Sequence, residues 1–99
     1  MTTQIAGHVI VSYDVSDDRL RLRVCKTLED FGDRVQYSVF ECLLTAEQLS
    51  RLWERLQGVM AERADGDSVR VYSLCRSCAS KVRWIGGKEP LEPQKVIII

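Results

Sequence analysis

The spacing of apolar residues predicts a buried strand followed by an amphipathic helix in the first third of the chain. The run from His8 to Asp14 is rich in β-branched and aromatic residues, which is typical of a buried strand. The next segment, Asp17 to Phe31, carries Leu20, Val24 and Leu28 at helical spacing. Gly32 follows directly, and a glycine just past the last apolar position is a common helix end.

A second helix is predicted to begin at Thr45. Thr45 and Gln48 have the spacing of a capping box, in which each side chain satisfies a backbone N–H of the first turn. The apolar stripe that follows is the strongest helical signal in the chain. We expect the whole stripe, Trp53 included, to pack into the core rather than to bind a cofactor. The stripe consists of Leu49, Leu52, Trp53, Leu56, Val59 and Met60.

Further strands are expected between and after the helices. The segment Val35–Leu43 is apolar, but its alternation changes phase at Val39-Phe40, which suggests a bulge. Ser68–Leu74 and Lys81–Ile85 are also strand-like, with a loop over residues 75–80 between them. These elements favour an α+β domain with helices on one sheet face, and they leave the strand order open.

The two ends of the chain have different patterns. Residues 1–7 carry no periodicity and are expected to be a loose leader. The tail, Lys88–Ile99, ends in four apolar residues, which are costly to leave in water. We therefore expect the tail to add a strand, either to its own sheet or to the edge of a second subunit. The second arrangement predicts a homodimer.

Composition indicates a small soluble protein of one domain. Apolar residues make up 45% and charged residues 28% of the 99 positions. No apolar run approaches the ~18 residues of a membrane helix, and no signal peptide pattern is present. These features predict a cytoplasmic protein without membrane contact, whose thiols are reduced. The thiols belong to Cys25, Cys42, Cys75 and Cys78.

The formal net charge of zero conceals an uneven distribution. Residues 1–67 hold 8 Lys/Arg and 12 Asp/Glu, a balance of −4, and residues 68–99 hold 6 and 2, a balance of +4. The basic C-terminal part suits a polyanion such as nucleic acid. It suits the acidic part of a second copy equally well, so charge does not decide between them.

Cys75-x-x-Cys78 has the spacing of half a zinc site. A structural zinc takes four ligands, and the one histidine, His8, lies in a predicted strand. Two pairs pooled in a dimer, or a redox pair, would also fit the spacing. We favour reduced, unligated thiols.

Asp14 is the first candidate for function. A carboxylate at the end of an apolar strand is costly to desolvate unless it is paired, hydrogen-bonded or bound to a metal. The passage from a strand to a helix is also a frequent place for a site. The alternative is that Asp14 caps the helix. Asp17 and Asp18 are expected to be helix-start residues.

Two motifs at this spacing resemble the small CRISPR-associated nucleases of the Cas2 family. The first runs from Tyr13 to Asp18 and continues to Arg21 and Arg23. The second begins at Gly32 and runs from Arg34 to Glu41. The later segments 69–75 and 82–86 extend the resemblance, which covers residues 8–86.

The resemblance implies a ferredoxin-like βαββαβ sandwich with an extra C-terminal strand, which forms a dimer. Residues 8–86 would form the nuclease-type domain, and residues 87–99 a tail whose strand pairs across the dimer. It further implies that the region after Gly32 holds two strands, bent where the apolar phase changes.

The resemblance also implies a metal-dependent endonuclease. Asp14 would bind Mg²⁺, and a two-fold dimer would supply a second Asp14. The further site residues implied are Tyr13, Arg21, Arg23, Arg34 and Phe40. Arg21 and Arg23 are two positions apart, so they fan around the helix and do not face one phosphate together.

The substrates implied are single-stranded RNA or double-stranded DNA, and the partner is the Cas1 integrase of spacer acquisition in antiviral defence. An alternative is a dimeric scaffold that binds DNA and the integrase without chemistry. A weaker third interpretation is a regulatory module that binds a small ligand.

Overall fold

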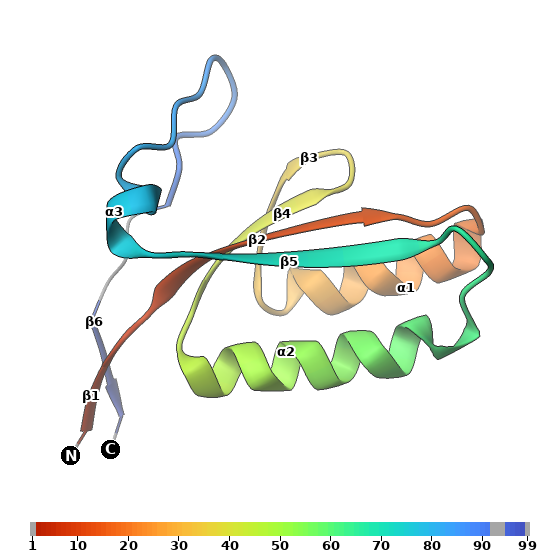
Figure 1. Ribbon diagram of the computed structural model, residues 1–99, viewed down its shortest axis with the longest axis horizontal. Coiled ribbons are helices and arrows are strands. Elements are labelled where there is room, and N and C mark those ends of the chain that lie inside the picture. Colours follow the sequence, from red (N-terminus) through yellow and green to blue (C-terminus); the bar gives the residue numbers. More distant parts are fainter. Residues whose placement is uncertain (1, 92–94, 99) are drawn as a thin grey trace.

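The computed structural model describes residues 2–91 and 95–98. Its elements run from β1 to β6 along the chain (Figure 1). Among the described residues, no helix has the length and apolar character needed to span a membrane. The elements are β1 (Thr2–Ile5), β2 (Gly7–Asp14), α1 (Asp18–Glu29), β3 (Gly32–Gln36), β4 (Val39–Leu44), α2 (Ala46–Val59), the 3₁₀ helix η1 (Met60–Glu62), β5 (Ser68–Leu74), α3 (Arg76–Ala79) and β6 (Lys95–Ile98).

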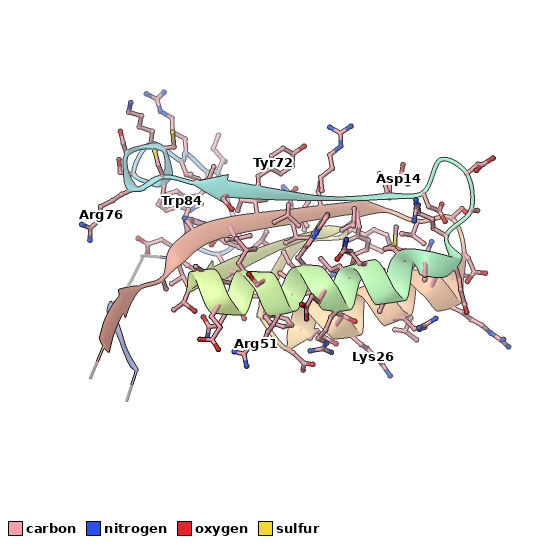
Figure 2. All side chains as sticks on the ribbon, turned by 60° about the horizontal axis from the view of Figure 1, so that its bottom comes forward. Asp14, Lys26, Arg51, Tyr72, Arg76 and Trp84 are labelled. Carbon is pink, nitrogen blue, oxygen red and sulfur yellow. The ribbon has the colours of Figure 1, made fainter. Side chains whose placement is uncertain are left out.

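The main sheet has four strands in the order β3-β4-β2-β5, and every neighbouring pair is antiparallel. The elements β2-α1-β3-β4-α2-β5 follow the βαββαβ order of a ferredoxin-like fold. Helices α1 and α2 lie together on one face of this sheet (Figures 1 and 2). The fold implied by the resemblance is confirmed.

The alternation along β2 determines which residues form the core. Val9, Val11 and Tyr13 point toward the helices and are buried, so the predicted buried strand is confirmed. Phe40 and Cys42 of β4 lie opposite Val11 and Val9 and complete this buried layer. The helices contribute Leu20, Val24, Leu28, Leu52, Leu56 and Met60 to the same cluster.

The segment after Gly32 forms a hairpin rather than one bulged strand. β3 and β4 are joined by a turn at Tyr37-Ser38, and their register shifts between Arg34 and Gln36. The apolar phase changes because β3 is an exposed edge strand, whereas β4 is buried between β3 and β2. The two strands implied by the resemblance are confirmed, and the single strand Val35–Leu43 is wrong.

Gly32 is required by close approach of the two strands. A Cβ at this position would lie 2.5 Å from Cys42 Sγ and 2.9 Å from Cys42 Cα, with the Glu41 carbonyl oxygen also in contact. Because two of these three atoms belong to backbone, a larger residue has no easy way to fit. Gly32 was expected to end the first helix, but α1 already ends at Glu29 and Gly32 is the first residue of β3.

Helix α2 begins as predicted, because the Thr45–Gln48 capping box is present with both hydrogen bonds. The prediction that Trp53 packs in the core is wrong, since its side chain is 44% exposed. Leu52 and Leu56 take the centre of the buried stripe, and Trp53 lies at its margin, one residue beyond Leu52.

The strand predicted at Lys81–Ile85 is also wrong. The chain leaves β5 through the short helix α3, where a loop was expected, and does not return alongside β5. Lys81–Ile85 therefore does not pair with the open edge of β5, and Trp84 and Ile85 are exposed. The chain then reaches β4, where the Leu91 backbone N–H donates to Glu41 Oε1 at 2.7 Å.

The two ends of the chain pair with each other. β1 and β6 form a separate antiparallel ribbon in which Thr2 lies opposite Ile98 and Ile5 opposite Lys95. The expectation of a structureless leader over residues 1–7 is therefore wrong, because an isolated segment gives no sign of a partner 90 positions away. Pairing of the tail across a dimer stays a prediction.

Candidate active site at the end of strand β2

Asp14 is the last residue of β2 and is exposed. Because Tyr13 points toward the helices, Asp14 points to the opposite, helix-free face of the sheet. Its partner in the register of β5 is Ser68, the first residue of that strand. Figure 2 places Asp14 at one end of the sheet and Arg76 and Trp84 at the other.

Helix α1 does not use Asp14 as its cap. The N-cap is Asp17, whose Oδ2 accepts a hydrogen bond from the Leu20 backbone N–H at 2.8 Å. Asp18 occupies the first turn, as expected of a helix-start residue. The alternative role considered for Asp14 is thus filled by another residue, which leaves its carboxylate available for a ligand.

A second aspartate fixes the loop that follows Asp14. Asp67 Oδ1 accepts hydrogen bonds from the backbone N–H and the hydroxyl of Ser16, both at 3.0 Å, and Oδ2 accepts from the Ala64 N–H at 3.1 Å. These bonds lower the pKa of Asp67, the Ser16 backbone contributing most. Asp67 was not singled out from the sequence, where it stands in an ordinary polar loop. Its partner is 51 positions away, so no local pattern marks it.

The fit to a magnesium ion is partial in a single chain. Within residues 2–91 and 95–98, no three His, Cys, Asp or Glu side chains gather as a set of metal ligands. Asp14 supplies one exposed oxygen ligand of the kind that Mg²⁺ prefers. Such an ion commonly keeps waters and substrate phosphates as its remaining ligands, so one carboxylate per chain is compatible with it.

The predicted residues Tyr13, Arg21 and Arg34 line one open pocket of about 290 Å³ on the helix side of the sheet end. The Tyr13 hydroxyl lies 3.5 Å from the Tyr37 carbonyl, and burial, with a contribution from Cys25, raises the pKa of Tyr13 to about 12. The Arg34 guanidinium lies 5.3 Å from the centre of the Tyr37 ring. The remaining lining residues are Asp18, Leu22, Cys25 and Tyr37.

Arg21 and Arg23 are on different faces of α1, as their spacing predicts. Arg21 donates through Nη1 to the Val15 carbonyl at 3.0 Å and through Nη2 to Asp18. Arg23 Nη1 lies 3.6 Å from Glu62 Oε2 and borders a different pocket. Arg21 therefore braces the loop after Asp14, and Arg23 is not brought to the same place.

Phe40 has no surface from which to contact a substrate. Its side chain is fully buried, and its ring centroid lies 6.3 Å from that of Tyr13. Phe40 is therefore a core residue that packs near the Tyr13 ring. Of the six predicted site residues, Tyr13, Arg21 and Arg34 meet on the helix side of the sheet, whereas Asp14 lies at the end of β2 on the opposite face. Arg23 and Phe40 join neither group at the surface.

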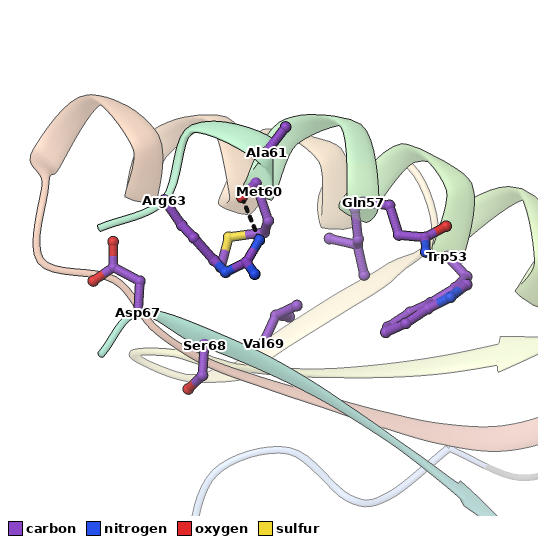
Figure 3. Close-up of a pocket in the computed structure, with 9 residues that line it drawn as sticks. Trp53, Gln57, Met60, Ala61, Arg63, Asp67, Ser68 and Val69 are labelled. Atoms are coloured by element: carbon purple, nitrogen blue, oxygen red, sulfur yellow. Dashed lines mark hydrogen bonds between the residues drawn. The ribbon is translucent and has the colours of Figure 1, made fainter. Parts of the chain in front are cut away.

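A larger groove of about 600 Å³ runs between α2 and β5 (Figure 3). Trp53, Met60 and Val69 line it, and Arg63 donates to the Met60 carbonyl at 3.1 Å. Asp67 closes the groove beside the loop that follows Asp14. The groove holds no predicted site residue.

A zinc ion has no complete ligand set in the described part of one chain. Cys75 and Cys78 are exposed, and His8 is buried with its Nε2 3.2 Å from Glu41 Oε2. With the histidine held in the sheet, the two thiols remain half of a site.

Comparison with known proteins identifies the family. Residues 8–82 match the family described as CRISPR associated protein Cas2. The chain belongs to the Cas2 family. A relative from Chloroflexus aurantiacus, named CRISPR-associated endoribonuclease Cas2 1, is 39% identical over 91% of this chain and 96% of its own length.

Solved structures agree with this assignment. The hypothetical protein TT1823 from Thermus thermophilus superposes with a TM-score of 0.73 and 31% identity, over 87% of this chain and 99% of that one. A chain of a structure titled Partial Cas6-RT-Cas1–Cas2 complex superposes with a TM-score of 0.67 and 26% identity, over 80% and 90% of the two chains.

Proposed function

We propose that this Cas2 protein is a dimeric, magnesium-dependent endonuclease of CRISPR spacer acquisition, with Asp14 as the metal ligand. The observation that carries the proposal is the position of Asp14, which is exposed at the end of β2 while Asp17 caps the helix. An exposed carboxylate without a capping role, held by a rigid strand, is suited to bind a cation. Relatives that are named endoribonucleases support the same activity.

The helix-free face of the sheet is the proposed dimer surface. At one end it is covered by α3 and the residues that follow, which explains why His8 is buried there. Toward the other end Ile10, Ser12 and Tyr72 are only partly covered, and Tyr72 is 46% exposed. A two-fold axis through this open part would bring two Asp14 carboxylates to one interface.

Each residue of the site then has a separate task. A bound Mg²⁺ would polarise the scissile phosphate and favour ionisation of an attacking water. The Asp14 carboxylates would hold the ion, and Asp67 would keep the loop after Asp14 in place through Ser16. Arg34 is exposed, and its planar, positively charged guanidinium group suits a phosphate of the nucleic-acid strand.

The alternative function is a scaffold that binds DNA and the Cas1 integrase without cutting. It is favoured by the single carboxylate per chain and by the engagement of Arg21 and Arg23 in contacts within the protein. The similarity to the chain in the Cas1–Cas2 complex structure supports a Cas1 partner under either proposal. We expect cytoplasmic localisation in both cases.

The deciding experiment compares wild-type protein with Asp14→Asn on labelled single-stranded RNA and on duplex DNA. Each substrate is incubated with Mg²⁺ or with a chelator. Asp65→Asn is the matched control, because it makes the same change at an exposed aspartate of the loop before β5, near Asp14 but not on β2. The oligomeric state of all three proteins is measured by light scattering, so that loss of the dimer is not mistaken for loss of chemistry.

Cleavage that requires both Mg²⁺ and Asp14, and survives Asp65→Asn, would establish the nuclease and its substrate. Cleavage that is absent, or indifferent to Asp14, would contradict it. In that case an integration assay with Cas1 tests the scaffold: Asp14→Asn should support integration at the wild-type rate. DNA binding should then weaken steeply with salt, because phosphate contacts release counterions.

A further inference from the structure

A pair of exposed cysteines lies at the end of the sheet opposite to Asp14. Cys75 directly follows β5, and Cys78 is the third residue of α3. The register of β2 with β5 puts Asp14 beside Ser68 and His8 beside Leu74, so the thiols are roughly 20 Å from the candidate active site. This inference concerns a different site and does not depend on the proposed nuclease activity.

The local structure places the two thiols side by side. Cys75 is the N-cap of α3, and its Sγ accepts a hydrogen bond from the Cys78 backbone N–H at 3.3 Å. An N-cap and an N3 residue lie about one helical turn apart, which puts their Cα atoms roughly 5–6 Å apart. That separation is within the range of disulfide-bonded cysteines, about 4.4–6.8 Å. A disulfide therefore needs a rotation of side chains and no rearrangement of the sheet.

The two thiols differ in a way that suits an attacking and a resolving cysteine. The Cys78 backbone N–H and then the Cys78 thiol stabilise the Cys75 thiolate, so the pKa of Cys75 is lowered. The same contact with Cys75 raises the pKa of Cys78. Arg76 stands next to Cys75, and the C-terminal part of the chain is basic, which attracts anionic thiol reagents.

The other two cysteines lack this arrangement. Cys42 is fully buried behind Gly32, and burial raises its pKa to about 11. Cys25 is partly buried in the pocket beside Tyr13, and its Sγ lies 4.0 Å from Arg34 Nη1. The reactivity of the Cys75 and Cys78 thiols can therefore be compared with that of Cys25 and Cys42 in the same protein.

We propose that Cys75 and Cys78 form a reversible redox dithiol that exchanges with low-molecular-weight disulfides such as glutathione disulfide. The Cys75 thiolate attacks one sulfur of the disulfide, forms a mixed disulfide and releases one glutathione thiolate. Cys78 then loses its proton, attacks the Cys75 sulfur and releases the second glutathione. The protein gives up two electrons and two protons, and the external disulfide is reduced to two thiols.

The product would tie the end of β5 to the first turn of α3. This junction matters for the rest of the chain, because α3 is the point from which residues 80–91 run back to Glu41. Several residues of that segment line a shared pocket with α3: Val82, Trp84, Glu89, Pro90 and Leu91. The redox state of the pair would therefore act on the segment that covers one end of the sheet.

The test uses purified full-length protein in buffers of increasing glutathione disulfide to glutathione ratio, quenched by acid. The remaining thiols are alkylated, and the mass of the intact chain is measured. We expect the chain to lose two hydrogens and to accept two fewer alkyl groups as the ratio rises. Excess dithiothreitol should reverse both changes.

Three variants assign the roles. Cys75→Ser and Cys78→Ser should each lose the internal disulfide completely, and Cys25→Ser should leave it unchanged. Cys78→Ser should also accumulate a chain carrying one glutathione on Cys75, because the resolving thiol is missing. Circular dichroism of each variant confirms that the fold is retained.

Three results would overturn the proposal. The first is the absence of an internal disulfide at every buffer ratio. The second is a disulfide that joins two chains on a non-reducing gel instead of closing within one. The third is a reduced protein that retains one zinc ion per two chains after gel filtration and whose thiols are then shielded from alkylation.

Discussion

Phe40→Leu separates a core role from a substrate-contacting role at a residue that the family resemblance places in the site. The side chain is fully buried, and its ring lies 6.3 Å from that of Tyr13 at a tilt of 34°. Replacing a buried phenylalanine by leucine removes half of the side-chain carbons that alanine would remove, which costs about 1–2 kcal/mol. Loss of the aromatic pair adds about 0.5–1.5 kcal/mol.

We therefore expect Phe40→Leu to lower the free energy of unfolding by about 2–3 kcal/mol, or the melting temperature by about 10–20 °C for a chain of this size. Urea unfolding followed by circular dichroism measures the loss, at one fixed protein concentration because a dimer's stability depends on it. Phe31→Leu is the matched control. Phe31 is partly buried with Arg55 5.3 Å from its ring, so the loss should be about 1 kcal/mol or less.

Nuclease activity supplies the second half of the test. Well below its melting temperature, folded Phe40→Leu should cleave within about twofold of the wild-type rate, since Phe40 has no exposed surface. A variant that unfolds like the wild type but has lost cleavage would refute this reasoning. It would mean that Phe40 reaches the substrate in another conformation.

Three further changes test the scaffold around the site. Gly32→Ala should lower the free energy of unfolding by about 2 kcal/mol or more in urea, because the new Cβ would overlap the backbone of Cys42. Gly58→Ala is the control: this position in α2 has open space around it, so the substitution should raise the free energy of unfolding by up to about 1 kcal/mol. The folded protein raises the pKa of Tyr13, so between pH 10 and about 12 this hydroxyl ionises in the unfolded chain first and stability falls. Tyr13→Phe should therefore lose less stability over this range than the wild type. An alkaline melting profile equal to that of the wild type would contradict this. Asp67→Ala should destabilise the protein at neutral pH, because the folded protein lowers the pKa of this carboxyl and is stabilised by its ionised form. The melting temperature of the variant should approach that of the wild type below about pH 3.8, where the carboxylate becomes protonated. A difference that is constant with pH would show that the charge of Asp67 is irrelevant.

The sequence alone was sufficient for several elements whose signal is local. The alternation of β2, the stripe of α1 and the Thr45–Gln48 capping box were all readable, because each depends on residues within one or two turns. Asp14 also stood out locally, as a charge at the end of an apolar run. Periodicity by itself did not settle the strand order, and the family resemblance was needed to divide the segment after Gly32 into two strands.

Only the tertiary structure decided which residues meet across the sheet. Phe40 and Trp53 are both large and apolar, yet one is fully buried and the other is 44% exposed, because burial depends on what packs opposite. Lys81–Ile85 has strand-forming residues but does not run along the edge of β5, and residues 2–5 form a strand because the distant β6 pairs with them.

The residues of the candidate site also divide into those that the sequence identified and those that only the structure revealed. The sequence identified Asp14 as a candidate, but Asp67, which holds the adjacent loop through Ser16, became apparent only when residues 51 positions apart were brought together. The sequence also placed Tyr13 next to Asp14, whereas the pleat of β2 turns them to opposite faces of the sheet. Local patterns are set by short-range propensity and spacing, while contacts between distant segments depend on the complete fold.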